Sequence, residues 1–356
     1  MPAAASLTTN FRCLDATDPD WNVLIKKCRG WHPFYLSGLV KTEAAFHKAS
    51  AKLLVSGSGE EIVVYPVLAF LLPGKHEPGY DLCGLPYAGP ISSTEDPAVH
   101  SRLVTDFRNA LHDLAPDYGW VTDFCRLNPF ATTPVSDEDR SDSAEQVYVD
   151  LTGEYEQIQD GYKAGGRRNV KRANSAAGEL KPLATESDYV SFASLYRIRM
   201  SELKAPPRYR FDEEYFRALF HCFRDNCLLL GAFMNGRLAG GSLNLRGNGY
   251  LFSYLLAVDY GYQHVRLSHG LNDLAVRIGN RQGDKVYVLG GGVCGADSVL
   301  EYKKSFSSKT FPQVCLKVVL DKKQYDRLCA DGTPKDTNAS FFPPWRQQCD
   351  TSSYEN

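Results

Sequence analysis

The chain has 356 residues, 43% of them hydrophobic, and a formal net charge of −2 at pH 7. A chain of this length exceeds one average domain, so two domains of about 150 residues each are expected. The near-neutral charge excludes a protein that binds nucleic acid through its overall charge, and any such contact therefore requires a local basic patch.

The ten cysteines contain no CxxC pair and share no zinc-site spacing with the histidines. The N-terminal stretch lacks the basic start and apolar segment of a secretory signal. The longest apolar run, at 63–72, is much shorter than the ~20 residues of a membrane span. We therefore expect a cytoplasmic protein with free thiols, no metal and no membrane span.

The first part of the chain alternates between helical and strand patterns. Residues 11–58 are expected to be mostly helical, and the apolar positions Val99, Leu103, Phe107 and Leu111 predict a helix over 96–114. Strands are expected at 53–55, 62–72, 120–127 and 147–151, with loops at 80–91 and 136–145.

The second part has a more regular order of elements. Helices are expected at 185–203 and 213–222, strands at 227–234, 237–245 and 250–257, then a helix at 267–282 and a strand at 286–289. The Asn235-Gly236 turn between two apolar runs predicts a β-hairpin. This order is typical of a GNAT-type acyltransferase core. A strand at 313–320 and a helix at 322–329 follow.

A basic segment precedes these helices. Residues 165–178 read GGRRNVKRANSAAG, and they place Arg167, Arg168, Lys171 and Arg172 within six positions. On a helix the last three share one face. The pattern fits either a solvated helix face or a phosphate contact, because arginine forks suit phosphate oxygens.

The stretch 289–306, LGGGVCGADSVLEYKKSF, follows the apolar run that ends at Leu289. Glycines at a strand end permit positive φ and close approach of another molecule. Lys303 follows about a dozen residues later, on a short helix expected to start near Ser298. The stretch fits either an acyl-transfer site or a tight turn followed by a surface helix.

Several stretches together resemble the Fem-type (FemABX) family of nonribosomal peptidyltransferases, and they occur in the family's order between about residues 31 and 320. The matching stretches are YDLCGLPYAGPISS from Tyr80, FCRLNPF from Phe124, VYVDLT from Val147, the basic segment from Gly165, LYRIRM from Leu195, YRFDEEYF from Tyr209, and LGGG with EYKKSF from Leu289 and Glu301.

The resemblance implies an α+β fold with two GNAT-like domains, each a mixed, mostly antiparallel sheet flanked by helices, without the family's helical-hairpin arm. It places an acceptor-side domain at 1–155 and an aminoacyl-donor domain at 156–320. A helix and irregular tail at 321–356 would pack back on the body.

The resemblance also implies the reaction. Aminoacyl-tRNA would be the donor, an amine on a small molecule or peptide the acceptor, and the product an amide of a natural product or cell-wall precursor. No cofactor is expected beside this co-substrate. The amino acid, the acceptor and the oligomeric state are left open.

The family's Phe-Lys pair falls on Tyr302-Lys303 in this sequence. Lys303 would stabilise the oxyanion or the departing ribose oxygen, and Tyr302 would stack on the terminal adenine or line the acceptor pocket. Further substrate contacts are expected at Tyr87, Arg126, Arg210, Tyr215, Tyr254, Gly290, Gly291 and Gly292, and tRNA phosphate contacts at Arg167, Arg168, Lys171 and Arg172. Tyr215 and Tyr254 also fit core aromatics, and Arg126 fits a structural ion pair.

Two other functions fit the sequence. An acyl-CoA N-acyltransferase would hold the CoA pyrophosphate at a helix start through a Q/RxxGxG/A loop, but the corresponding residues, Gln263 to Ser268, include no glycine. A noncatalytic tRNA- or peptide-binding module would not need Lys303 and the glycine triplet.

Overall fold

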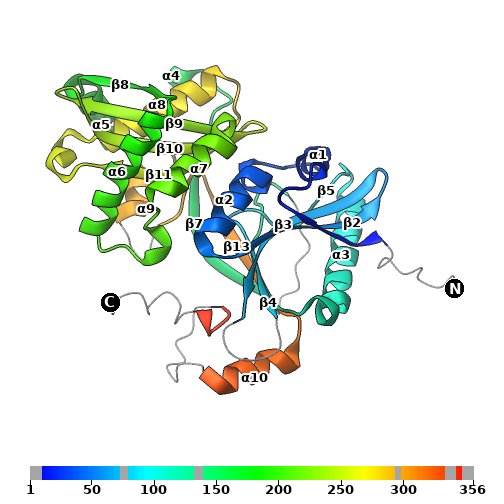
Figure 1. Cartoon of the computed structure of the whole chain (residues 1–356). Coiled ribbons are helices and arrows are strands. Elements are labelled where there is room, and N and C mark those ends of the chain that lie inside the picture. The colour runs from blue at the N-terminus through cyan, green and yellow to red at the C-terminus, as the bar shows by residue number, and fades with distance from the viewer. Residues whose placement is uncertain (1–9, 73–78, 132–138, 293–297, 333–341, 347–356) are drawn as a thin grey trace. The chain divides into compact units, whose positions relative to one another are not determined.

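The computed structural model describes residues 10–72, 79–131, 139–292, 298–332 and 342–346 (Figure 1). The chain divides into two compact units. The first consists of residues 1–143 and 313–356, and the second of residues 144–312. The chain crosses from one unit to the other within two strands, β7 and β13.

The first unit is built on a sheet with the strand order β1-β2-β3-β4-β6-β13 and β5 beside β3. Only β4 and β6 pair in parallel among the pairings described within this unit. The strands are β1 (Arg12–Asp15), β2 (Ser50–Ser58), β3 (Glu61–Leu71), β4 (Tyr80–Gly84), β5 (Ile91–Ser92), β6 (Trp120–Arg126) and β13 (Thr310–Val319). The helices are α1 (Asp20–Lys27), η2 (Pro33–Tyr35), α2 (Ser37–His47), α3 (Pro97–Tyr118) and α10 (Lys322–Gly332).

Helix α3 shows how the sequence sets an element's bounds. The Asp96 side chain accepts hydrogen bonds from the first amides, those of Ala98 and Val99, and Gly119 ends the helix with φ of +67°. The helix buries Leu103, Phe107 and Leu111, among others, against the sheet. The four-residue spacing therefore predicted both the helix and its buried face.

The second unit has the strand order β7-β12-β11-β10-β9-β8, in which only β11 and β12 pair in parallel among the pairings described. The strands are β7 (Arg140–Asp150), β8 (Glu179–Leu183), β9 (Cys227–Met234), β10 (Arg237–Gly247), β11 (Tyr250–Val258) and β12 (Val286–Gly290). The helices are α4 (Tyr155–Asp160), α5 (Ala164–Ala176), α6 (Glu186–Glu202), η3 (Pro207–Tyr209), α7 (Glu213–Phe223), η4 (Arg224–Asn226), η5 (Tyr260–Val265), α8 (Leu267–Arg281) and α9 (Ser298–Lys303).

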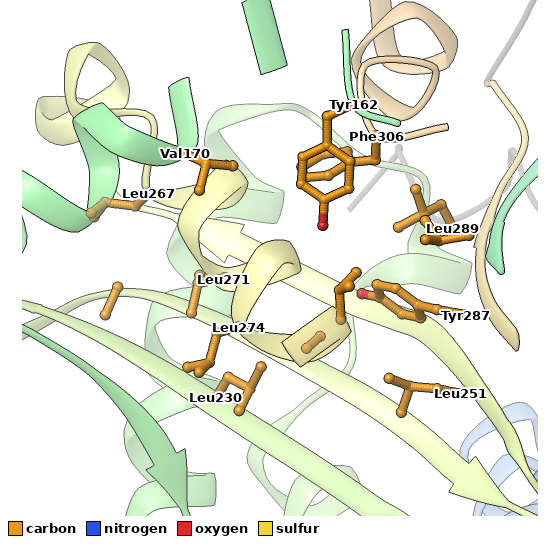
Figure 2. Close-up of a cluster of buried hydrophobic side chains, with 14 of the residues drawn as sticks. Tyr162, Val170, Leu230, Leu251, Leu267, Leu271, Leu274, Tyr287, Leu289 and Phe306 are labelled. Carbon is orange, nitrogen blue, oxygen red and sulfur yellow. The ribbon is translucent and has the colours of Figure 1, made fainter. Parts of the chain in front are cut away.

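Helices α6 and α8 cover opposite faces of this sheet. A Cβ at Gly241 would lie 2.3 Å from the ring of Phe192 on α6, and one at Gly240 would lie 3.3 Å from Leu271 on α8. Successive strand residues point to opposite faces, so the two glycines admit one helix on each side. Figure 2 shows the α8 side, where Leu271 and Leu274 lie among buried side chains of the sheet, of α5 and of the segment after α9.

The mixed α+β fold with two sheet-and-helix units confirms the predicted fold class. The hairpin at Asn235-Gly236 is present, with φ of +51° and +76° at the two turn residues. The predicted loop at 80–91 is wrong in its first part, because 80–84 form β4 in parallel with β6. The loop predicted at 136–145 is wrong from Arg140, where β7 begins, and residues 132–138 lie outside the described part.

Among the other elements that were not predicted, three are poorly buried. They are β1, α4 and β8, whose residues are mostly exposed or only partly buried and so carry little hydrophobic periodicity. The division of the chain also differs from the expected domain ranges, because the contacts of 144–155 lie with the second unit and those of 313–320 with the first.

A buried carboxylate anchors the C-terminal segment 342–346 to the first unit. Asp81 on β4 is 2% exposed and accepts hydrogen bonds from Thr122 Oγ1 at 2.7 Å, Trp345 Nε1 at 2.9 Å and Arg346 Nε at 2.8 Å. Arg346 also donates to the carbonyls of Phe70 and Leu71 at the end of β3. Removing one partner of a buried ion pair leaves an uncompensated charge.

We expect Asp81→Ala to lower the unfolding free energy of the first unit by about 3–5 kcal/mol, because Arg346 and Trp345 lose their shared acceptor. All four tryptophans lie in this unit, at 21, 31, 120 and 345, so tryptophan fluorescence in urea follows its unfolding. Asp15→Ala removes the exposed ion pair with Lys52 and serves as control, with a loss below about 1 kcal/mol. Equal losses in the two variants would contradict the anchoring role.

Candidate active site

Strands β11 and β12 pair in parallel over only three residues each, 250–252 with 286–288. Just beyond this pairing, the register between β10 and β11 shifts, and Tyr254 lies at this irregular position of β11. Sheets of this kind hold ligands at the carboxyl ends of parallel strands. A ligand site is therefore expected at the carboxyl ends of β11 and β12.

Gly290 and Gly291, at the end of β12, are favoured as glycines for different reasons, one by its backbone conformation and the other by close packing. Gly290 has φ of +85°, in the left-handed region that favours glycine. Gly291 lies against β7, where a Cβ would come within 2.9 Å of the Glu145 carbonyl oxygen and 2.4 Å of Gln146 Nε2. The structure describes Gly292 as a partly buried residue outside regular structure.

Lys303, the last residue of α9, reaches back to this glycine stretch. Its Nζ donates a hydrogen bond to the carbonyl oxygen of Gly291 at 2.7 Å. Neighbouring contacts hold α9 in place, because Lys304 pairs with Glu145 at 2.5 Å and Lys163 pairs with Glu301 at 3.2 Å. The ammonium group therefore has a defined position at the end of β12.

Tyr302 is held from two sides by helix α8. Its hydroxyl donates to the Ser268 carbonyl at 3.0 Å and accepts from Asn272 Nδ2 at 3.0 Å. Its ring packs edge-on against His269 and Phe306. Burial raises the pKa of Tyr302, so the phenol stays neutral. These contacts make Tyr302 a link between α9 and α8, where the sequence predicted adenine stacking or a pocket lining.

The hydrogen bonds continue from α8 into the sheet. Tyr287 on β12 donates its hydroxyl toward Asn272 Oδ1 at 3.2 Å and Asn244 Oδ1 at 2.8 Å, and Asn244 Nδ2 donates to Ser242 Oγ at 3.2 Å. Tyr287 and Asn244 are both fully buried. We call this series, from Ser268 through Tyr302, Asn272, Tyr287 and Asn244 to Ser242, the polar chain.

Tyr215 and Tyr254, two of the predicted substrate contacts, lie against each other. Their hydroxyls are 2.6 Å apart, one from α7 and the other from the irregular position of β11. Tyr215 is 3% exposed and stacks on Phe211. Arg210, just before Phe211, is exposed and donates from Nε to the Ala205 carbonyl at 2.6 Å.

The basic segment forms α5, and its small residues let it pack closely. A Cβ at Gly166 would lie 2.5 Å from the Ser305 carbonyl oxygen, and one at Gly270 on α8 would lie 2.9 Å from Ala173. Arg167 donates to the carbonyls of Asp160 and Tyr162 and so closes the preceding turn.

The other three cations of α5 differ from Arg167. Arg168, Lys171 and Arg172 are exposed on the face opposite the buried Val170. None of the three has an ion pair or hydrogen bond with another residue in the described ranges.

Two predicted contacts lie in the first unit. Tyr87 has φ of +64°, and its carbonyl lies 2.9 Å from His32 Nε2. Burial raises the pKa of Tyr87 to about 12, against the opposing effect of the Arg126 guanidinium. The Arg126 guanidinium also lies over the ring of Phe124. The structure thus places these two predicted residues near each other.

Sequence reasoning missed the residues that support the site, namely Asn244, Ser268, His269, Asn272, Tyr287 and Glu145. A signal existed for Asn272, because a polar residue on a helix that is buried along most of its length requires a partner. Tyr287 stood inside a predicted buried strand, where its hydroxyl likewise required one.

Neither a metal site nor a membrane-spanning helix is found in the described part of the chain. It holds no cluster of three or more His, Cys, Asp or Glu side chains able to bind a metal ion. Among the helices described, none combines the length and the apolar character needed to span a bilayer.

Comparisons with known proteins agree with this geometry. Residues 164–304 match the family model described as "Acetyltransferase (GNAT) domain". A search of curated proteins finds no match. Among solved structures, FemX is similar with a TM-score of 0.68 at 9% identity, covering 89% of this chain and 99% of that chain.

Two further solved structures are similar at lower TM-scores. The L-PGS of Bacillus licheniformis has a TM-score of 0.56 at 10% identity, covering 87% of this chain and 95% of its own. The C-terminal domain of a putative lysylphosphatidylglycerol synthetase of Agrobacterium fabrum has a TM-score of 0.54 at 12% identity, covering 87% and 92%.

At these identities the structural similarities establish the fold, while the domain match confirms the prediction of an acyltransferase. The site described above, from α5 to Lys303, lies within the matched residues. The chain therefore has the Fem-type form of the GNAT fold, with its acetyltransferase (GNAT) domain at 164–304.

Proposed function

We propose that the protein is an aminoacyl-tRNA-dependent aminoacyltransferase that joins the aminoacyl group of a charged tRNA to an amine acceptor. The observation that carries the proposal is the Lys303 ammonium, fixed 2.7 Å from the Gly291 carbonyl at the end of β12. The reaction needs no cofactor beside the charged tRNA and would take place in the cytoplasm.

The chemistry requires positioning and charge stabilisation more than a nucleophilic side chain. The acceptor amine attacks the ester carbonyl carbon, the C–N bond forms and the bond to the ribose oxygen breaks. The proton lost by the amine ends on the ribose hydroxyl. Alignment of the two substrates can contribute roughly 7–11 kcal/mol to lowering the barrier.

Lys303 would stabilise the negative charge of the tetrahedral intermediate. An ammonium has three N–H donors, so it can hold the Gly291 carbonyl and an oxyanion at the same time. A well-placed donor of this kind is worth about 3–4 kcal/mol in the transition state. Tyr302 would act as a positioning residue, because it ties α9 to α8 next to Lys303.

The start of α8 favours a tRNA donor over acyl-CoA. Arg266 precedes the helix with φ of +66°, and η5 occupies the place of a glycine-rich pyrophosphate loop. Nearby α5 presents Arg168, Lys171 and Arg172 on its exposed face. Exposed cations on one helix face are suited to the phosphates of an acceptor stem.

The Tyr215–Tyr254 pair and Arg210 would contact the acceptor. FemX and the lysylphosphatidylglycerol synthetase share the fold at TM-scores above 0.5. A peptide or small-molecule amine, as in a natural product or cell-wall precursor, is the acceptor class that we propose.

The identity of the acyl donor distinguishes the proposed aminoacyl-tRNA-dependent reaction from an acyl-CoA-dependent one. We expect amide product from a pool of charged tRNA and a panel of amines, and loss of that product when ribonuclease is added first. Acetyl-CoA with the same amines is the parallel arm. Product from acetyl-CoA that ribonuclease leaves unchanged would overturn the proposed donor.

We expect Lys303→Ala to lower kcat by about 10²–10³-fold, because the oxyanion loses its donor. Donor binding and the far-UV circular dichroism spectrum should stay as in the parent. Lys181→Ala is the matched control, since it removes an ion-paired lysine of the same unit that lies on the edge strand β8. A Lys303→Ala enzyme with the parent's turnover would refute the assignment.

The α5 phosphate contacts predict a salt effect. Arg168→Ala and Lys171→Ala should each reduce the slope of log Kd against log salt for charged tRNA by about 0.7–0.9. Lys323→Ala, which removes an exposed cation of α10 in the first unit, should leave the slope unchanged. An unaltered slope in the α5 variants would contradict the phosphate contacts and indicate that this face is an ordinary solvated helix surface.

A further inference from the structure

The end of α6 and the loop after it present an unusual density of exposed cations. Residues 197–210 hold four arginines and one lysine against a single acid, Glu202. Glu202 pairs with Arg199 at 2.8 Å. Arg197, Lys204, Arg208 and Arg210 are all exposed. This segment lies outside α5 and was not part of the predicted phosphate contacts.

Two exposed tyrosines stand beside arginines on this surface. The Arg199 guanidinium lies 5.7 Å from the ring centre of Tyr260 on η5, and that of Arg208 lies 5.0 Å from the ring centre of Tyr209. Tyr260 is 64% exposed and Tyr209 is 47% exposed. Each site thus combines an exposed aromatic ring and a guanidinium that lies over one of its two faces.

Helix η5 connects this surface with α5. The Arg199–Tyr260 contact joins the end of α6 to η5, and η5 packs against α5. Arg266, the exposed residue that ends η5, stands at the start of α8. We call the segments 164–176, 197–210 and 259–266 together the cationic belt.

The belt concentrates positive charge on a chain whose net charge is −2. Its three segments contain ten Arg and Lys residues, eight of them arginine, and only two acids, Glu202 and Asp259. Arginine is suited to phosphate because its planar fork donates two parallel hydrogen bonds, and it also stacks on aromatic and base faces. The belt is therefore complementary to a phosphate chain with stacking groups.

We propose that the belt binds an unpaired RNA strand, with bases stacked on Tyr260 and Tyr209 and phosphates held by the surrounding cations. The inference rests on the proposed function, for which it supplies a path for the unpaired end of the donor RNA. A duplex can offer only its phosphates to the belt, because its base faces are already stacked on one another, whereas a single strand also offers its bases to aromatic side chains.

The test is fluorescence anisotropy on the full chain with a fluorescein-labelled ten-nucleotide RNA, as a single strand and as a duplex with its complement. We expect tighter binding of the single strand. Tyr260→Ala and Tyr209→Ala should each weaken it about 5- to 150-fold, the range for loss of one stacked base, with the salt slope unchanged. Tyr260→Phe should keep the parent affinity, because the ring remains.

Charge is tested separately from stacking. Lys204→Ala should lower the salt slope by about 0.7. The matched controls lie in the first unit, with Tyr118→Ala for an exposed ring and Lys323→Ala for an exposed cation, and neither should change binding. Parent affinity in both tyrosine-to-alanine variants, or equal affinity for strand and duplex, would overturn the proposal.

A membrane is the competing partner, because Ile198 and Leu203 are exposed nearby. Binding of phosphatidylglycerol vesicles that falls in the tyrosine variants, without RNA binding by the parent, would overturn the RNA assignment. The proposed function can fail independently. Ribonuclease-insensitive transfer from acetyl-CoA would refute that function, whereas ribonuclease-sensitive transfer with unaltered RNA binding in the variants would refute only the belt.

Discussion

The polar chain from Ser268 to Ser242 constrains the second unit more than any other set of contacts at the candidate site. It joins α9, α8, β12 and β10 through side chains that are mostly removed from water. A buried polar group without a partner costs about 1–3 kcal/mol, so these elements are stable in the arrangement that satisfies every member. Lys303 follows Tyr302 directly, and its position at Gly291 is therefore a consequence of this chain.

The main elements of the fold follow from local patterns in the sequence. Both Asn-Gly turns of the second unit, at 235–236 and 248–249, have positive φ at each residue, and they set the β9-β10-β11 meander that the hairpin signal predicts. Strand β8 escaped prediction because its side chains are mostly exposed and it contains Pro182, features of an edge strand with no alternating apolar pattern. Strand β4 escaped because it runs directly into the glycine- and proline-rich sequence from Gly84 to Pro90, which is typical of a loop.

The candidate site was predictable in its residue types but not in its contacts. Lys303 and the glycines stood out because a cation and an open backbone suit acyl transfer. Tyr302 was expected to contact substrate and Arg167 to contact phosphate, yet each is held by carbonyls of other segments. Such partners depend on how α8 and the α4–α5 turn pack, and no local pattern encodes that packing.

The cations of the second unit have two roles, which differ in whether the side chain has an acidic or carbonyl partner. Those that hold the fold together have acids or carbonyls within hydrogen-bonding distance, as Lys304 has Glu145 and Arg246 has Asp284 at 2.7 Å. Those on the exposed face of α5 have no such partner among the described residues. Exposed like charges repel one another and slightly destabilise a fold. A cluster of them on a chain whose net charge is only −2 is the feature from which the proposed polyanionic partner follows.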